Sequence, residues 1–474
     1  MAALSIVPAT IAASIATLIL LDCFIRQTPL LKLKPTQEAE GRFPHLTDTI
    51  PLLGNLGLLL TPTSRVQIRK IGCVWRYLPA FLFKDKMLLV LRPDFIQTVL
   101  KAGVAEPLMP ARWSRIFGAG SLPVVRGVEH ARLRGATAVA FSEDSIEEVI
   151  PRLREIAREC LAKMVAYPEA GQGRLYPAEA LHEFAFKAFC SFIVGTDERQ
   201  ICALTRLQTD LKNIMKGLGD VFLPEWIPFS GFNKALAARD RASNALRDIV
   251  EERRLVLADT EERKDALSAL ILEGTLATTE IVDVILSWMT GVDKTAKLTS
   301  TCLYTMIYKF SPEFADMVKT VANTASLSPH DLANLPIFEA FIKETQRCYS
   351  TIPGAFRTLA VDTSFDGVLV KAGTPLDLSY GFATYHIDGL SFEADRFMGK
   401  AALDVVAPET FIPFGAGERM CPGGRLARMI VKCFLYELLR DYDVKAGVGK
   451  VKSVSFPMIY VDPCIALKRM EIIK

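Results

Sequence analysis

The sequence lacks the usual marks of a chain built from several units. Its 474 residues contain no low-complexity linker, no block of like charges and no internal repeat. Length alone would allow two or three domains, but no segment marks a boundary between them. Half of the residues are hydrophobic and 23% are charged, which is the composition of an ordinary globular protein with a large core.

An excess of charge of either sign is also missing. The formal net charge is +3, close to neutral for a chain of this length. Proteins that bind the phosphates of nucleic acid need a strongly basic face. Composition therefore gives no case for a nucleic-acid partner, and we predict none.

Closely spaced cysteine pairs are absent as well. The ten cysteines are scattered along the chain and include no Cys-x-x-Cys pair. Small secreted domains that depend on disulfides have a regular cysteine framework instead. The pattern does not indicate a disulfide framework, and it suits a reducing compartment.

Charge is absent from residues 1–21, where Ala, Ile and Leu predominate. About 20 apolar residues are needed to span a bilayer. Asp22 ends the run, and Arg26, Lys32 and Lys34 follow it. No positively charged segment precedes the run, which is also long for a cleaved signal peptide. The positive-inside rule then places the remainder of the chain on the cytosolic side.

The N-terminus is therefore predicted to be an uncleaved signal anchor, with a cleaved signal peptide or a buried helix as the alternatives. We expect a membrane anchor over residues 1–25, a linker over 26–50 and one folded domain over 51–474.

Hydrophobic periodicity predicts long helices accompanied by short strands. Apolar residues recur at i, i+3 and i+4 in the long segments 145–166, 234–257, 278–309 and 335–348. Shorter strand-like runs flank them, at residues 87–91, 368–378 and 453–461. The predicted fold class is mainly α with a small β-rich subdomain.

One loop, residues 414–423, has the composition of a turn that holds a ligand. It reads Phe-Gly-Ala-Gly-Glu-Arg-Met-Cys-Pro-Gly and leads into a helix-like run. Its cysteine, Cys421, is suited to act as an anionic thiolate. Backbone N–H groups of the turn, the start of the following helix and a bound cation can compensate that charge. The alternative is a surface turn with an incidental buried cysteine.

The residues around Cys421 fit a flat cofactor. Gly417 and Gly423 permit positive φ or a close approach of the backbone. Phe414 is placed to cover the sulfur, and Arg419 to meet an acidic group of the cofactor.

The spacing Phe-x-x-Gly-x-Arg-x-Cys-x-Gly resembles the haem-binding signature of the cytochrome P-450 family. With average residue usage, these five residue types coincide by chance less than about once per million positions. The resemblance extends from about residue 51 to the C-terminus. It implies the cytochrome P-450 fold, a haem-thiolate catalytic domain over 51–474, haem b as the cofactor and Cys421 as the iron ligand. Thiolate donation to iron favours cleavage of the O–O bond.

A carboxylate and two arginines are implied to support the loop. Glu344 and Arg347 lie three apart on one face of a predicted helix, 77 residues before Cys421. Taken alone they would be a solvated surface pair. Their order, with Arg396 in a later Ala-Asp-Arg-Phe segment, resembles the family's Glu-x-x-Arg helix and Pro-Glu-Arg-Phe segment, although Ala394 replaces the proline. The resemblance implies a structural role.

A second group is implied to bind the haem propionates. His130 and Arg134 lie four apart on one face of a predicted helix, so both can donate to carboxylates. The alternative is a basic exposed face. The family has an aromatic residue or histidine with an arginine at this spacing, and the resemblance adds Arg357 and Arg419 as propionate partners.

The segment 290–295 departs from the family pattern. The family typically has Ala/Gly-Gly-x-Asp/Glu-Thr, where the glycine makes room for dioxygen and the acid–alcohol pair delivers protons. Gly291 and Asp293 match, but Lys294 stands at the threonine position and Thr295 follows it. One residue turns a helix by about 100°, so Thr295 faces the same way only if the helix bulges.

Three interpretations of this segment remain open. In the first, Gly291, Asp293 and Thr295 are the catalytic residues that activate oxygen, through a bulge or ordered water. In the second, proton delivery is altered. In the third, the protein is a haem-thiolate isomerase or dehydratase that consumes no dioxygen. A pair between Asp293 and Lys297 explains those two charges but leaves Lys294 unexplained.

The implied activity is that of a monooxygenase which oxidises a lipophilic, terpenoid- or steroid-like small molecule in secondary metabolism. It would use O2 and electrons from NADPH, delivered by a flavoprotein reductase. The implied location is the endoplasmic reticulum membrane, with a single span and a cytosolic catalytic domain. A haem-binding protein without catalysis is an alternative from another class.

The resemblance also implies which residues contact the substrate and which contact the reductase. Residues 223–229 and the following helix resemble the roof of the substrate site in members that act on sterols, retinoids and terpenoids. The implied substrate contacts are residues 107–122, 352–356 and 456–459. The candidate basic contacts for a reductase are Arg132, Arg425, Arg428 and Lys432.

Overall fold

The computed structural model describes most of the chain from residue 87 onward and three short strands before it. The described residues are 33–34, 45–46, 73–76, 87–109, 111–219, 230–260, 265–309, 312–323, 327–352, 354–365, 367–379, 381, 391–398, 411–454 and 460–470.

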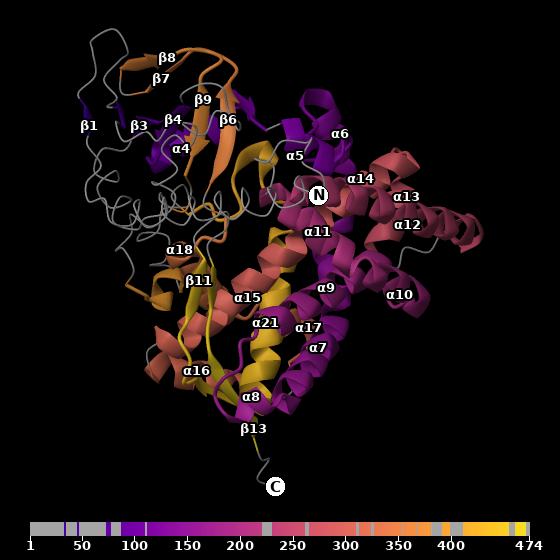
Figure 1. The fold of residues 1–474 in the computed structure, drawn as a ribbon, viewed down its shortest axis with the longest axis vertical. Coiled ribbons are helices and arrows are strands. Elements are labelled where there is room, and N and C mark those ends of the chain that lie inside the picture. Colours follow the sequence, from indigo (N-terminus) through magenta and orange to yellow (C-terminus); the bar gives the residue numbers. More distant parts are fainter. Residues whose placement is uncertain are drawn as a thin grey trace, which may run out of the picture.

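A β-rich part and a larger helical part make up the described molecule (Figure 1). The strands are β1 (Leu33–Lys34), β2 (His45–Leu46), β3 (Cys73–Arg76), β4 (Met87–Val90), β5 (Ala105–Pro107), β6 (Ala355–Leu359), β7 (Thr363–Phe365), β8 (Val368–Val370), β9 (Pro375–Leu378), β10 (Tyr442–Ala446), β11 (Lys452–Val454), β12 (Tyr460–Asp462) and β13 (Ile465–Arg469).

The α-helices are α4 (Pro93–Lys101), α5 (Ala111–Phe117), α6 (Gly127–Ala140), α7 (Glu143–Ala166), α8 (Pro168–Gly171), α9 (Ala178–Val194), α10 (Glu198–Arg206), α11 (Gln208–Gly219), α12 (Gly231–Thr260), α13 (Ala266–Glu273), α14 (Thr278–Met289), α15 (Gly291–Tyr308), α16 (Pro312–Asn323), α17 (Pro329–Ala333), α18 (Pro336–Cys348) and α21 (Gly424–Asp441). Two 3-10 helices are η2 (Ala394–Phe397) and η3 (Gly417–Arg419).

The main sheet has the order β1-β2-β3-β4-β9-β6-β5. β4 pairs antiparallel with β3 and parallel with β9, and β6 pairs antiparallel with β9 and β5. β4 reads Met-Leu-Leu-Val and all four residues are buried, as expected of a strand covered on both faces. Three smaller sheets pair β7 with β8, β10 with β13 and β11 with β12.

The predicted mainly helical fold is confirmed, and one predicted helix is interrupted. α7, α12 and α18 match the expected segments within a few residues. The segment 278–309 is broken at Thr290 into α14 and α15. The strand expected over 368–378 is likewise split into β8 and β9, by a turn in which Gly373 has a φ of 82°.

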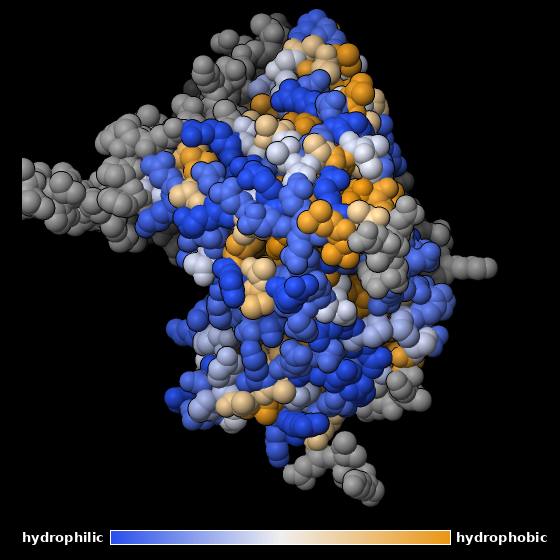
Figure 2. Space-filling model, turned by 90° about the vertical axis from the view of Figure 1, so that its right-hand side faces the viewer, coloured by the Kyte–Doolittle hydropathy of each residue, from blue (hydrophilic) through white to orange (hydrophobic). Residues whose placement is uncertain are grey.

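The centre of the helical part is formed by α9, α15 and α21. α9 is largely buried, and its one charged stripe, Glu179, Glu183 and Lys187, forms ion pairs at the surface. Phe184 of α9 packs against Phe434 of α21 with ring centroids 5.2 Å apart. α15 contacts both α9 and α21 and runs through the middle of the molecule (Figure 1). The face on the side of α10 and α12 is mainly hydrophilic, with hydrophobic residues scattered over it (Figure 2).

A second hydrophobic core lies under the main sheet and holds the loop that precedes α21. Ile412 and Ala416 of this loop pack with Phe95 and Leu100 of α4 and with Leu378 of β9. The loop is thus anchored in the β-rich part, while the helix that it starts belongs to the helical core.

Within the described residues, no helix is both long and apolar enough to cross a bilayer. The predicted anchor, residues 1–25, lies outside the described residues, as does most of the predicted linker. The anchor therefore stays a prediction.

Candidate functional site

The loop that carries Cys421 is closed by its own backbone. The Cys421 N–H donates to the Phe414 carbonyl oxygen at 2.9 Å, and the Met420 N–H donates to the Gly417 carbonyl oxygen at 3.1 Å. Gly415 and Gly417 have φ values of 76° and 68°, in the left-handed region that favours glycine. The local sequence thus folds back on itself and presents Cys421 at the start of α21.

Gly417 has the positive φ that was one of the two predicted reasons for a glycine here, and packing adds a second requirement. A Cβ at this position would lie 2.1 Å from the Leu100 carbonyl oxygen of α4, so glycine lets the loop touch the backbone of α4. Gly423 has an ordinary φ, and a Cβ there would meet Phe141 at 3.5 Å, a normal contact. The close approach at Gly417 is to protein, not to a cofactor.

We expect Gly417→Ala to lower the free energy of unfolding by about 2 kcal/mol or more, because the variant combines a positive φ with a backbone clash. Gly423→Ala is the matched control and is expected to change it by less than about 1 kcal/mol. Urea unfolding of both variants measures the difference. Equal stability of the two variants would contradict the role given to Gly417.

Cys421 combines an accessible surface with protein on most sides. The residue is exposed, yet burial raises the pKa of its thiol. The residue thus keeps some accessible surface while protein surrounds its sulfur. The Gly423 backbone N–H bonds to the sulfur and lowers the pKa, as do Lys294, Arg134 and Arg428 to a smaller extent. These groups favour the thiolate, but burial has the larger effect and raises the thiol pKa. A further positive charge is therefore needed for the thiolate to form.

Phe414 covers the start of α21. A Cβ at Gly424 would lie 3.1 Å from the Phe414 ring, so the ring packs directly on this glycine. The Arg428 guanidinium lies over the ring, 5.1 Å from its centroid. Gly424 is not among the predicted site residues. The glycine pair that follows Pro422 is the sequence feature from which its close packing could have been predicted.

His130, Arg134, Arg357 and Arg419 gather near the loop from three elements. The Arg419 Nη1 donates to the Leu122 and Val125 carbonyl oxygens at 3.2 and 2.8 Å. Burial lowers the pKa of Arg419, and the nearby Arg357 contributes in the same direction. Burial and then Arg419 lower the pKa of His130 to about 4. His130 is therefore neutral at physiological pH, so it offers one N–H donor and not a positive charge.

The break at Thr290 lies beside the expected oxygen-activating residues. The Thr290 N–H is shared between the Leu286 and Ser287 carbonyl oxygens, at 3.3 Å from each. A Cβ at Gly291 would lie 3.0 Å from the Phe189 ring of α9, so this glycine allows close helix packing. The space that Gly291 vacates is occupied by Phe189.

Thr295 and Lys294 differ in what they face. Thr295 is 3% exposed and packs in the core. α15 is regular from Gly291 onward, so no bulge at 294–295 turns Thr295 toward Cys421. Lys294 is half-buried and donates to the Thr290 carbonyl oxygen at 2.9 Å, and its charge is among those that lower the pKa of the Cys421 thiol. Asp293 pairs with Lys297 at 2.7 Å.

Known proteins with similar sequences show which family has this arrangement. A model of the cytochrome P450 family matches residues 44–463. The chain belongs to the cytochrome P450 family.

Similar proteins support the same family. Cytochrome P450 26A1 of Danio rerio is 25% identical over 88% of both chains. Abscisic acid 8'-hydroxylase 1 of Arabidopsis thaliana is 26% identical over 73% of this chain and 72% of its own. A cyanobacterial CYP120A1 with bound retinoic acid has the same fold, with a TM-score of 0.76 at 18% identity over 93% of this chain and 100% of its own.

P450 proteins bind haem b through a cysteine thiolate, and the residues of this P450 fit that group. Arg134 and Arg357 are half-buried and make no ion pair within the described part of the chain. The Arg419 Nε is buried without a hydrogen-bond partner, and its nearest carboxylate, Glu418, is 3.7 Å away. Arg134 and Arg357, which have no ion pair within the described residues, and the unbonded Nε of Arg419 suit the two propionates of haem. Among the described cysteines, Cys421 is the one whose loop carries Arg419 and whose thiol pKa is lowered by Arg134.

The Glu-x-x-Arg pair of this P450 is the centre of a buried network. The Glu344 carboxylate accepts from Arg347 Nε and Nη2 at 2.7 and 2.8 Å, with both side chains fully buried. It also accepts from the Glu393 backbone N–H at 2.9 Å and lies 3.3 Å from Arg396 Nε. Arg347 donates in turn to the Ser391 carbonyl oxygen at 2.5 Å. The network joins α18 to η2, so the surface pair considered as an alternative does not occur.

The four cations considered for a redox partner are all paired. Arg132 binds Glu129 and Glu280, and Arg425 binds Glu143 at 3.1 Å. The others, Arg428 and Lys432, share Glu339 at 2.9 and 2.8 Å. The Lys432 side chain is 5% exposed, which removes it from any docking surface.

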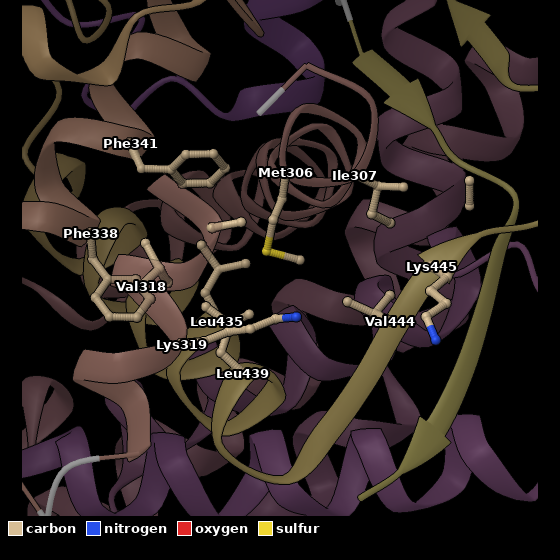
Figure 3. Close-up of a pocket in the computed structure, with 12 residues that line it drawn as sticks. Met306, Ile307, Val318, Lys319, Phe338, Phe341, Leu435, Leu439, Val444 and Lys445 are labelled. Carbon is tan, nitrogen blue, oxygen red and sulfur yellow. The ribbon is translucent and has the colours of Figure 1, made fainter. Parts of the chain in front are cut away.

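One further cavity, of about 250 Å³, lies between α15, α16, α18, α21 and β10. Met306 projects into it, with Val318 and Phe338 on one side and Val444 on the other (Figure 3). None of the predicted site residues lines it. This cavity is therefore separate from the site at Cys421.

Proposed function

We propose that this P450 is a monooxygenase that oxidises a lipophilic isoprenoid, using O2 and two electrons. The observation that carries the proposal is the exposed Cys421 in its glycine-rich loop, beside Arg134, which makes no ion pair within the described residues, in a chain of the P450 family. Haem bound to a thiolate supplies the chemistry of O–O bond cleavage.

The substrate class is inferred from similar proteins. By their names, one relative hydroxylates abscisic acid and a protein of the same fold binds retinoic acid. Both compounds are isoprenoids that carry a carboxylate. We therefore place terpenoid acids first among the candidate substrates and steroid-like molecules second.

The residues of the chain would bind the haem and hold the Cys421 loop in place. Arg134, Arg357 and Arg419 would hold the haem propionates, and His130 would add a neutral donor. The hydrogen bond from the Gly423 N–H stabilises the sulfur as an anion. Phe414, packed on Gly424, keeps the loop against α21.

Electrons would come from NADPH through a flavoprotein reductase, and the catalytic domain would face the cytosol from the endoplasmic reticulum membrane. Support for this part is the uncharged N-terminal run of 21 residues followed by basic residues. Because the four cations considered for docking are paired, a partner would have to compete with their carboxylates.

A second function is a haem-thiolate isomerase or dehydratase that consumes no dioxygen. The observation that favours it is Lys294, which stands where the family pattern has threonine and whose charge lowers the pKa of the Cys421 thiol. Thr295, the alternative alcohol, is buried in the core.

The two functions are separated by turnover with and without NADPH and reductase, using ¹⁸O-labelled dioxygen and a panel of terpenoid acids, steroids and neutral terpenoids. A monooxygenase incorporates one labelled oxygen atom and makes no product when NADPH is omitted. Product formed without NADPH, and without label, would overturn the proposal in favour of the second function.

A further inference from the structure

The cavity between α15, α16, α18, α21 and β10 is lined almost entirely by hydrophobic side chains. Its polar residues are two lysines, Lys319 and Lys445, among twelve that line it. Phe338 and Leu435 are each 1% exposed, so these walls are shielded from bulk water. None of the described lining residues carries a hydroxyl, an amide or a carboxylate. The cavity therefore lacks the groups that orient sugars, nucleotides and other polar ligands.

The size of the cavity suits one short apolar chain. A dry cavity of about 150 Å³ is large enough to bind benzene, and this one has a volume of about 250 Å³. At about 30 Å³ for each group of the size of a water molecule, it holds a chain of about eight methylene groups. Its walls extend from Phe338 on one side to Val444 on the other, with Met306 between them (Figure 3).

Lys319 of α16 gives the cavity a cationic end. Its amine extends toward the space between Met306 and Val444, whereas the amine of Lys445 points away from that space (Figure 3). Lys445 is paired with Asp443 at 2.7 Å. Lys319 is exposed, and no described carboxylate forms an ion pair with it. Its hydrocarbon stem lies along the apolar wall while its charge stays in water.

An apolar cavity with an unpaired amine at its mouth is complementary to an anion that carries a hydrocarbon chain. We propose that this cavity binds one free fatty acid of medium chain length, with its chain against Met306 and Phe338 and its carboxylate paired with Lys319. The two lysines disfavour a cationic amphiphile. The volume excludes the paired long chains of a phospholipid.

The position of the cavity gives such a ligand a role in stability. The cavity is walled by the three helices that organise the site: α15 starts at Gly291, α18 carries Glu344 and Arg347, and α21 follows Cys421. A ligand that binds only the folded state stabilises it by mass action. A bound fatty acid therefore strengthens the support of the Cys421 loop without entering the site itself.

The first test uses the unmodified protein with its haem. A phenylimidazole that ligates the iron is added to saturation, so that the site at Cys421 is occupied, and decanoate is then titrated by calorimetry. We expect one decanoate to bind per chain, with no change in the haem absorption spectrum, and the melting temperature to rise with decanoate concentration. Absence of binding, or binding only when the phenylimidazole is omitted, would overturn the proposal.

Filling the cavity provides the second test. Met306→Trp enlarges a side chain that projects into the space, and Val444→Phe fills it from the opposite wall (Figure 3). Each variant is expected to weaken decanoate binding by about tenfold or more, because a packed interior leaves no room for the chain. Leu255→Trp, at a position on α12 that is 75% exposed, is the matched control. Undiminished binding in a filled variant with a normal haem spectrum would contradict the proposed site.

Removal of the charge provides the third test. Lys319→Gln is expected to weaken decanoate binding by about two- to fivefold, the range of an exposed ion pair, and to leave decanol binding unchanged. Lys343→Gln is the matched control, because Lys343 pairs with Glu339 on α18 and does not line the cavity. Equal losses in the two lysine variants would overturn the pairing with Lys319.

Two other ligands complete the experiment. Decyltrimethylammonium should bind the wild-type protein more weakly than decanoate does, and a lysophospholipid should show no advantage over decanoate. Tighter binding of either one would overturn the assignment to a free fatty acid. All of these measurements record binding and not turnover, so their failure is distinguishable from failure of the proposed monooxygenase.

Discussion

Cys421→Ala is expected to abolish the thiolate-type reduced carbon-monoxide spectrum and all turnover, while the protein still folds. Cys421 is exposed and belongs to neither hydrophobic core, so its loss removes the iron ligand and little core packing. An aromatic and two glycines, Phe414, Gly417 and Gly424, hold the loop independently of the sulfur. Difference spectroscopy and thermal unfolding of the purified variant measure the two effects.

Cys433→Ala is the matched control. Cys433 lies on α21, is fully buried, and has a pKa raised by burial to about 12, so it is a core thiol. Its truncation should lower stability modestly and leave the spectrum unchanged. A normal thiolate spectrum in Cys421→Ala, or its loss in Cys433→Ala, would contradict the ligand assignment.

Glu344→Ala is expected to prevent accumulation of folded protein with haem. The substitution leaves Arg347 and Arg396 buried without their shared carboxylate. Breaking a buried pair in this way costs about 3–5 kcal/mol, against a total stability of about 5–15 kcal/mol for an ordinary protein. The measurements are soluble yield, haem content and the unfolding midpoint.

A neighbouring pair on the same helix provides the control. Lys343 lies 3.6 Å from Glu339, with side chains that are 33% and 25% exposed. Lys343→Ala should change stability by less than about 1 kcal/mol. Equal effects of the two substitutions would mean that the Glu344 network contributes no more than a surface pair.

Part of this site could be predicted from short stretches of sequence. The Cys421 loop is a local motif, because its turn is closed by hydrogen bonds within residues 412–421. Glu344 and Arg347 are also local, three apart on one helix. Such spacings can be recognised in the sequence because the residues that contact each other are only a few positions apart.

Other features depend on segments that are distant in the chain. Gly417 is needed because Leu100 of α4 lies against it, and Gly291 because Phe189 of α9 does. The sequence predicts a positive φ or a close approach to a cofactor at Gly417, and room for dioxygen at Gly291. A glycine in the sequence indicates that a Cβ would not fit at that position. Which neighbouring atoms exclude the Cβ is seen only in the tertiary structure.

The sequence by itself determined the family, the cofactor and the mainly helical fold, because motif spacing and hydrophobic periodicity are properties of the chain alone. The tertiary structure decided the electrostatics of the site. Burial by several elements lowered the pKa of His130, left Arg134 and Arg357 without ion pairs in the described structure, and placed Thr295 in the core. Desolvation and facing charges are set by what packs around a group, and no stretch of sequence contains that information.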